Sequence, residues 1–124
     1  MAYKVLIADD EPNIVISLEF LMKREGHAVS IARDGQQALE LIRSLQPDLV
    51  LLDVMMPFKS GLEVLQAVRA DEEIAATKIL LLTAKGRETD VAKGMALGAD
   101  AYMTKPFSTR ELAARVRQLL SSSA

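Results

Sequence analysis

Five side chains with the capacity for chemistry each follow a short apolar run of the sequence: Asp9, Asp10, Asp53, Thr83 and Lys105. Carboxylates brought close together repel one another, and a hard divalent cation that takes oxygen ligands, such as Mg²⁺, relieves that repulsion. A cation and Lys105 together would suit a dianionic phosphoryl group, which is stabilised by charge and by positioning. Each residue alone could equally be a helix cap, a turn residue or a surface charge. Their joint placement favours a phosphoryl site.

The elements that must position these side chains alternate along the chain. Short apolar runs without polar alternation are typical of parallel strands buried on both faces, and they occur at residues 5–8, 28–32, 49–52, 79–82 and 101–104. Amphipathic segments with helical spacing lie between and after them. Asp34, Ser60 and Ser108 each stand three residues before a Gln or Glu, which predicts helix starts. We therefore predict an α/β fold, (βα)₅, with a parallel sheet and right-handed crossovers.

The strand order decides whether the polar residues meet. Open α/β sheets bind ligands outside the carboxyl ends of their strands, at a point where the strand order reverses. If the order is 2-1-3-4-5, the strands that precede Asp9, Asp53, Thr83 and Lys105 are consecutive neighbours. Three carboxylates, one hydroxyl and one ammonium group would then share one shallow site.

Length and composition limit the possible functions. The chain has 124 residues, which predicts one domain over residues 1–124, and half of the residues are apolar. The net charge of −2 includes no basic stripe, so we expect no direct binding of nucleic acid. There are no cysteines, and the apolar start is too short for a signal peptide or a membrane span. We expect a cytoplasmic protein without membrane contact, with a frayed tail at residues 121–124.

The motifs also resemble those of a known family. Asp9-Asp10-Glu11, the segment 51–57 with Gly61, Leu82-Thr83-Ala84 and Lys105-Pro106-Phe107 are similar to the signature of the receiver domains of bacterial response regulators. The resemblance covers about residues 3–120 and includes receivers of the chemotaxis type. It implies a flavodoxin-like, doubly wound sheet of order 2-1-3-4-5, the order that general accounts of this fold already give for a chemotaxis receiver.

The resemblance implies a role for each site residue. Asp53 would be the phosphoacceptor, and Thr83, the backbone N–H of Ala84 and Lys105 would bind the phosphoryl group. Mg²⁺ or Mn²⁺ would be held by Asp9, Asp10, Asp53 and the backbone carbonyl of Met55. The Lys105-Pro106 peptide bond would be cis, which costs an X-Pro bond only about 0.5–1 kcal/mol.

A switch is also implied. Tyr102 resembles the aromatic residue that turns inward when Thr83 moves, although an ordinary half-buried tyrosine is the alternative. The helix expected at about 89–97 contains Gly94, which costs about 1 kcal/mol relative to Ala. Its apolar contacts should come mainly from Val91, Ala92 and Met95. We interpret this marginal helix as an element that phosphorylation could shift.

The implied partners are a sensor histidine kinase and either a downstream protein or an attached output domain. The domain would catalyse only its own phosphotransfer and dephosphorylation. Asp100, Glu111 and Arg115 match charge-pair positions of dimerising receivers, but Val91 and Ala101 do not. We therefore expect a monomer or a weak, phosphorylation-dependent dimer. The alternative is a receiver-like interaction module that acts without phosphorylation.

Two side chains should modulate how long the phosphoryl group lasts. Met55 lies two residues after the acceptor and Lys85 two residues after the threonine. Met55 is apolar, and the Lys85 ammonium has no lone pair with which to accept a proton from an attacking water. General-base help is therefore missing at both positions, unless both simply point to solvent. A flavin-binding protein is disfavoured because the first loop is acidic, and an aspartyl phosphatase because Asp-x-Asp is missing there.

Overall fold

The computed structural model describes residues 2–121, in which five parallel strands form one sheet. The strands are β1 Lys4–Ala8, β2 Ala28–Ala32, β3 Leu49–Asp53, β4 Lys78–Ala84 and β5 Ala101–Lys105. Their order is β2-β1-β3-β4-β5, and every neighbouring pair is parallel. The predicted α/β class, alternation and strand order are confirmed. Met1 of the predicted 1–124 domain and residues 122–124 of the predicted frayed tail lie outside the described residues, whereas Ser121, the first residue of that tail, is the last residue of a helix.

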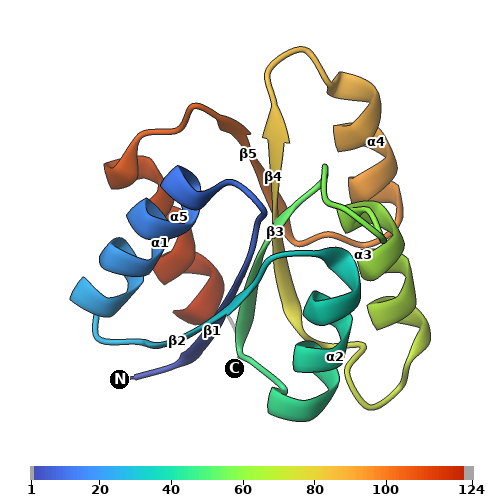
Figure 1. Ribbon diagram of the computed structural model, residues 1–124, viewed down its shortest axis with the longest axis horizontal. Coiled ribbons are helices and arrows are strands. Elements are labelled where there is room, and N and C mark those ends of the chain that lie inside the picture. Colours follow the sequence, from blue (N-terminus) through green and yellow to red (C-terminus); the bar gives the residue numbers. More distant parts are fainter. Residues whose placement is uncertain (1, 122–124) are drawn as a thin grey trace.

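Helices cover both faces of the sheet. They are α1 Pro12–Arg24, α2 Gly35–Leu45, α3 Gly61–Ala70, α4 Glu88–Ala96 and α5 Thr109–Ser121. Figure 1 shows α1 and α5 on one face and α2, α3 and α4 on the other. No helix within residues 2–121 is long and apolar enough to cross a membrane.

Two apolar layers result from the side-chain alternation of the strands. In β1, Val5 and Ile7 pack in the layer with α1 and α5, while Leu6 packs in the layer with α2 and α3. In β3, Leu51 and Leu52 divide between the layers in the same way. All five side chains are almost completely buried. Because both faces are covered, the strands β1, β3 and β4 have no polar alternation, as the sequence pattern indicated. The edge strand β5 does not follow the prediction, because Tyr102 and Thr104 are exposed.

The helix starts agree with the predicted caps. The side chains of Asp34, Ser60 and Ser108 each accept a hydrogen bond from the backbone N–H three residues later. At Ser60 the capping box is complete, because the Glu63 carboxylate also accepts the Ser60 backbone N–H. Gly98 follows α4 with a φ of 103°, a left-handed conformation that glycine adopts without steric cost.

The packing of α4 differs from the prediction. Ala92 and Met95 are exposed and Val91 is only partly buried, so these residues do not anchor the helix as expected. The buried residues of α4 are Asp90 and Gly94. A Cβ on Gly94 would lie 2.2 Å from the Cδ1 atom of Leu81 in β4. The glycine therefore allows the helix to approach the sheet closely, which a periodicity argument cannot detect.

Candidate functional site

The strand register brings the predicted residues to one edge of the sheet. Ala8 pairs with Leu52 across β1 and β3, so Asp9 and Asp53 each follow a paired position. Further along the sheet, Asp53 pairs with Leu82 of β4. Since the strands are parallel, all of their carboxyl ends meet at this edge, and the polar residues at the strand tips converge there.

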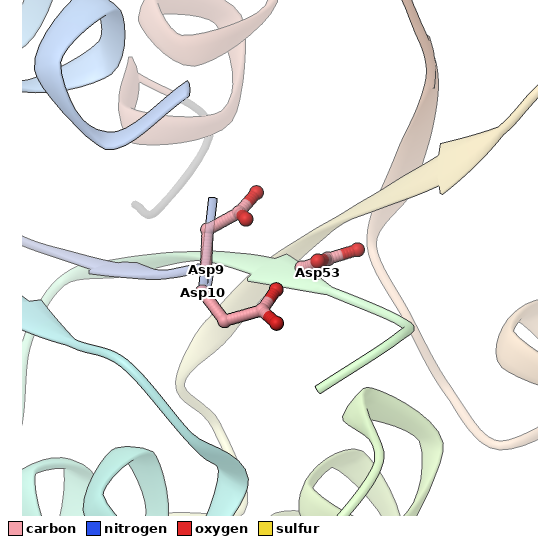
Figure 2. A group of neighbouring side chains, drawn as sticks. All are labelled: Asp9, Asp10 and Asp53. Carbon is pink, nitrogen blue, oxygen red and sulfur yellow. The ribbon is translucent and has the colours of Figure 1, made fainter. Parts of the chain in front are cut away.

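Three carboxylates form the centre of the site. Oxygen atoms of Asp9, Asp10 and Asp53 lie within 4.8 Å of one another. Figure 2 shows the three side chains at the ends of their strands, directed toward the same region. Asp9 and Asp53 are buried, whereas Asp10 is exposed. This arrangement requires a positive charge nearby, because buried like charges at this distance repel strongly.

The loop after β3 fixes Asp53 from the backbone side. The Val54 N–H donates to the Leu82 carbonyl at 3.0 Å, and the Gly61 N–H donates to the Val54 carbonyl at 2.8 Å. A Cβ on Gly61 would lie only 2.3 Å from the backbone oxygen of Asp53, so no larger residue fits there without a shift. The Met55 N–H donates to the Asp53 carboxylate at 3.2 Å.

Lys105, at the end of β5, supplies the positive charge. Its Nζ atom lies 2.8 Å from Asp9 Oδ2, 2.9 Å from Glu11 Oε1 and 3.4 Å from Asp53 Oδ2. The Lys105-Pro106 peptide bond is cis, as the resemblance implied. The lysine side chain is largely buried, and its ammonium group is therefore held among carboxylates.

These contacts shift two pKa values. Burial, and then the neighbouring Asp9 carboxylate, raise the pKa of Asp53 to about 7, against the opposing charge of Lys105. Burial disfavours the charged form of Lys105, but hydrogen bonds to Asp9 and Glu11 outweigh it and raise the pKa of the ammonium above its ordinary value. Lys105 is therefore cationic throughout the physiological range, while Asp53 stands at the border of ionisation.

Thr83 lies beside this cluster and opens onto a cavity. Its side chain is buried, and its hydroxyl donates only a long hydrogen bond, of 3.5 Å, to the Ala84 carbonyl. A cavity of about 440 Å³ borders Thr83 and is also lined by Ala84, Val91, Tyr102 and residues of the β4–α4 loop. Tyr102 is 45 % exposed. The cavity thus separates α4 from the end of β5, on the side where Tyr102 lies.

Comparison with known proteins gives the family. The family model of the response regulator receiver domain matches residues 5–117. The chain belongs to this family. It is 33% identical to the receiver domain of the Francisella response regulator 1452 (TM-score 0.89; 98% of this chain, 99% of that chain). It is 32% identical to the BeF3-activated DrrB receiver domain (TM-score 0.87; 98% and 99%). Against NtrX from Brucella abortus the identity is 26%, over 99% of this chain and 28% of the longer one (TM-score 0.90).

The receiver domain brings together most of the residues singled out from the sequence. Asp9, Asp10 and Asp53 form the carboxylate cluster, and Lys105 contacts two of them. Thr83 and Ala84 end β4, next to the paired Lys105 on β5. Membership in a two-component signalling family therefore agrees with a geometry in which every strand tip around Asp53 carries a polar group.

The two predicted lifetime residues, Met55 and Lys85, follow the strands β3 and β4 that end at the site. Met55 is 55 % exposed and Lys85 is exposed. Neither side chain makes a polar contact with the carboxylate cluster among the contacts of the described residues, although the Met55 backbone does. Their predicted effect on an attacking water stays a prediction.

Sequence reasoning assigned no role to Glu11. Its carboxylate accepts a hydrogen bond from Lys105 at 2.9 Å, although the two residues lie 94 positions apart. The only signal in the sequence was its place after Asp9 and Asp10 at a strand end. That position gives no direction for a flexible side chain, so only the structure identifies the contact.

Proposed function

We propose that this receiver domain is a phosphorylation-activated switch that accepts a phosphoryl group on Asp53 from the phosphohistidine of a sensor histidine kinase. The observation that carries the proposal is the position of Asp53, between two further carboxylates and the Lys105 ammonium. Asp53 is the only one of the three that ends the central strand β3. The backbone that follows Asp53 is held by the hydrogen bonds of Val54 and Gly61.

A divalent cation fits the donor set. Three carboxylate oxygens within 4.8 Å offer the hard oxygen ligands that Mg²⁺ prefers, and the same set suits Mn²⁺. Asp9, Asp10 and Asp53 would hold the cation, together with the backbone carbonyl of Met55. When bound, it would neutralise negative charge on the carboxylates and on the phosphoryl oxygens.

The residues of the chain carry out the transfer of the phosphoryl group. An oxygen of ionised Asp53 forms a bond to phosphorus, and the phosphorus–nitrogen bond of the donor breaks with its electron pair left on the imidazole. Lys105 and the backbone N–H of Ala84 stabilise the negative oxygens of the transferred group, and Thr83 donates its hydroxyl to one of them. Later attack by water would return Asp53 to the carboxylate and release phosphate.

The output of the switch would pass through Thr83. Its hydroxyl has no strong partner in this structure, so it is free to turn toward a phosphoryl oxygen. Movement of Thr83 changes the wall of the 440 Å³ cavity, into which Tyr102 could turn. The face formed by α4, β5 and α5 would then change shape for a downstream protein or an attached output domain. NtrX, of which this chain matches 28%, is a relative with additional chain outside the receiver.

The test of phosphorylation is direct. Incubation with acetyl phosphate and Mg²⁺ should add one phosphoryl group, detected by intact mass, and Asp53→Ala should abolish the addition. Asp71→Ala is the matched control, because Asp71 lies at the opposite end of α3, where it ends the helix. Equal labelling of Asp53→Ala and of the parent would show that Asp53 is not the acceptor.

The test of the switch uses tyrosine fluorescence. The chain has two tyrosines and no tryptophan, so Tyr102 is the only emitter in a Tyr3→Phe variant. Beryllium fluoride with Mg²⁺ should change its emission, as Tyr102 leaves the solvent, and Thr83→Ala should remove the change. An equal change in the Thr83→Ala variant would show that Tyr102 responds by another route.

The alternative is an interaction module that acts without phosphorylation. It predicts no labelling by acetyl phosphate and no fluorescence response, with a surface that binds its partner equally well in Asp53→Ala. Nothing in the described residues favours it over the switch, because Asp53, Thr83 and Lys105 are all present and adjacent.

A further inference from the structure

The ammonium group of Lys105 lies among carboxylates before any phosphoryl group arrives, and it donates hydrogen bonds to two of them, Asp9 and Glu11. An ammonium has three N–H donors and no lone pair, and three carboxylates surround it, those of Asp9, Glu11 and Asp53. A phosphoryl group that binds Lys105 through more than the one remaining N–H must therefore take the place of one of the two hydrogen-bonded carboxylates. The identity of the displaced group influences how readily the site accepts the phosphoryl group.

Two of the three carboxylates are poor candidates for displacement. Asp9 is completely buried and also accepts the backbone N–H of Glu11 at 2.9 Å. Asp53 is buried and is itself the acceptor. Moving Asp9 away would leave a buried charge unpaired, which is costly. Asp53 keeps its place because, once phosphorylated, it passes its negative charge to the phosphoryl group bonded to it. Neither can simply return to water.

The Glu11 carboxylate, unlike those of Asp9 and Asp53, is neither buried nor required elsewhere in the site. Its side chain is 58 % exposed, and it stands at the N-cap of α1, where it makes no side-chain hydrogen bond to the helix. Its contact with Lys105 at 2.9 Å is the only side-chain contact found for it among the described residues. The Glu11 carboxylate can therefore leave Lys105 and be solvated at once.

We propose that Glu11 occupies the position on Lys105 that a phosphoryl oxygen takes, and that it thereby slows phosphorylation of Asp53. It is a positioning residue that acts through Lys105, and this role rests on the proposed function of Asp53. In the free domain the Lys105 ammonium donates a hydrogen bond to Glu11. On phosphorylation the lysine exchanges the Glu11 carboxylate for the phosphoryl group. Glu11 therefore sets part of the threshold of the switch.

The expected change in the phosphorylation rate follows from the partial exposure of the Glu11–Lys105 ion pair. Ion pairs with one solvated partner are weak, so their removal changes a rate by about two- to fivefold. With acetyl phosphate and saturating Mg²⁺, the initial rate of labelling of Glu11→Gln should be higher than that of the parent by about this factor. Glu19→Gln is the control: Glu19 lies on the same helix and pairs with Lys23 instead, and its rate should match the parent.

A second variant separates competition for Lys105 from a general effect of negative charge on an anionic donor. Glu11→Asp keeps the charge but shortens the side chain, and aspartate at an N-cap accepts backbone N–H groups of the first helical turn. Its carboxylate should turn toward the helix and away from Lys105. Competition therefore predicts faster labelling in Glu11→Asp as well, whereas a general charge effect predicts the rate of the parent.

The outcomes decide between the alternatives. Faster labelling in both Glu11→Gln and Glu11→Asp supports the proposal, with melting temperatures measured alongside to exclude unfolding as the cause. A rate in Glu11→Asp equal to that of the parent, or a rate in Glu11→Gln that is unchanged or lower, overturns it. Failure of the parent itself to be labelled would overturn the proposed function of Asp53 instead.

Discussion

Two neighbouring βα units, β3–α3 and β4–α4, build the centre of this receiver domain in opposite ways. In α3, Val64, Leu65 and Val68 are completely buried, and the helix begins with a full capping box at Ser60. In α4, the residue at the N-cap, Arg87, makes no capping bond with its side chain. Helix α3 is anchored by buried apolar side chains, and helix α4 is not.

The loops of the two units differ in the same direction. The β3–α3 loop is tied to α2 by the Gly35 N–H, which donates to the Pro57 carbonyl, and to itself by the Gly61 N–H. The β4–α4 loop has a single backbone hydrogen bond of its own, from the Arg87 N–H to the Ala84 carbonyl at 3.3 Å. Asp90 of α4 is buried, with the Arg87 guanidinium as its ion-pair partner.

The two units therefore suit different roles, β3–α3 the phosphoryl-transfer reaction and β4–α4 the conformational change that follows it. The unit that carries Asp53 has a loop tied by several backbone hydrogen bonds and a helix anchored by buried apolar side chains, which suits a reaction that depends on fixed positions. The unit that carries Thr83 ends in a helix with little apolar anchoring, which can change position at small cost. We interpret β3–α3 as the frame of the site and β4–α4 as the part that moves.

The largest expected effect tests the anchoring directly. Leu65→Ala should lower the free energy of unfolding by about 2–5 kcal/mol, because it removes a buried side chain and leaves a cavity. Met95→Ala in α4 should change it by less than about 0.5 kcal/mol, since Met95 is 43 % exposed. Urea unfolding measures both. Comparable losses in the two variants would mean that α4 is anchored as firmly as α3.

The sequence predicted the fold and a marginal α4, but it did not predict which residues of α4 pack against the sheet. The five apolar runs and the caps at Asp34 and Ser60 mark the elements well, because periodicity and capping are local. The strand order came from family resemblance. The packing of α4 could not be predicted, because periodicity indicates which face of a helix is apolar but not how closely Gly94 approaches Leu81.

Hydrogen exchange should show the same difference without mutation. Amides of residues 66–70 in α3 should exchange only through extensive unfolding, while those of residues 92–96 in α4 open locally. We expect the α4 amides to exchange on the order of 100-fold faster at neutral pH. Exchange followed by mass spectrometry of peptides resolves the two helices. Equal protection would remove the basis for treating α4 as the mobile element.

The protonation of Asp53 in the β3–α3 unit should make the stability of the domain depend on pH. Asp53 is held at the end of β3 with its pKa raised to about 7, so the folded domain binds a proton that the unfolded chain releases. Stability without metal should therefore fall as the pH rises from about 4 to about 7. A raised pKa costs roughly 1.4 kcal/mol for each unit at higher pH. At pH 8, Asp53→Asn should melt about 5 °C or more above the parent.

The control is the same comparison of Asp53→Asn with the parent at low pH. At pH 4 the Asp53 carboxyl is protonated in the folded state, so the advantage of Asp53→Asn should shrink. Mg²⁺ at pH 8 should raise the melting temperature of the parent more than that of the variant, by linkage. A stability advantage that persists undiminished at pH 4 would point to packing and away from charge repulsion.

Side-chain direction limited the prediction of the site as well. The carboxylates at the strand tips could be predicted to converge, since the backbone places them there. Glu11 and Asp100 could not: Glu11 reaches Lys105, and the Asp100 carboxylate accepts hydrogen bonds from Arg69 at 2.9 Å and from the Ile79 N–H at 2.8 Å. Asp100 matches a charge-pair position of dimerising receivers, but in this structure its carboxylate is already engaged within the chain.

The smallest expected effect compares the two loops at the site. Met55 comes from the β3–α3 loop and Lys85 from the β4–α4 loop, and both side chains are exposed. Hydrolysis of the aspartyl phosphate requires a water in line with the phosphorus, and neither side chain can accept its proton. We therefore expect the phosphoryl group to outlast the seconds scale, and Met55→Asn or Lys85→Glu to hasten its loss by about tenfold, below the roughly 10²–10⁴-fold of full general-base catalysis.

The rigidity of the two loops should separate these variants. A side chain on the fixed β3–α3 loop holds a water at small entropic cost, whereas one on the loosely tied β4–α4 loop loses freedom when it does so. Met55→Asn should therefore accelerate the loss more than Lys85→Glu. The measurement follows the decay of the labelled mass in Mg²⁺ buffer after removal of the donor. Decay of the parent within seconds, or no acceleration in either variant, would show that these side chains do not set the lifetime. A larger effect from Lys85→Glu would mean that the β4–α4 loop becomes ordered once Asp53 is phosphorylated.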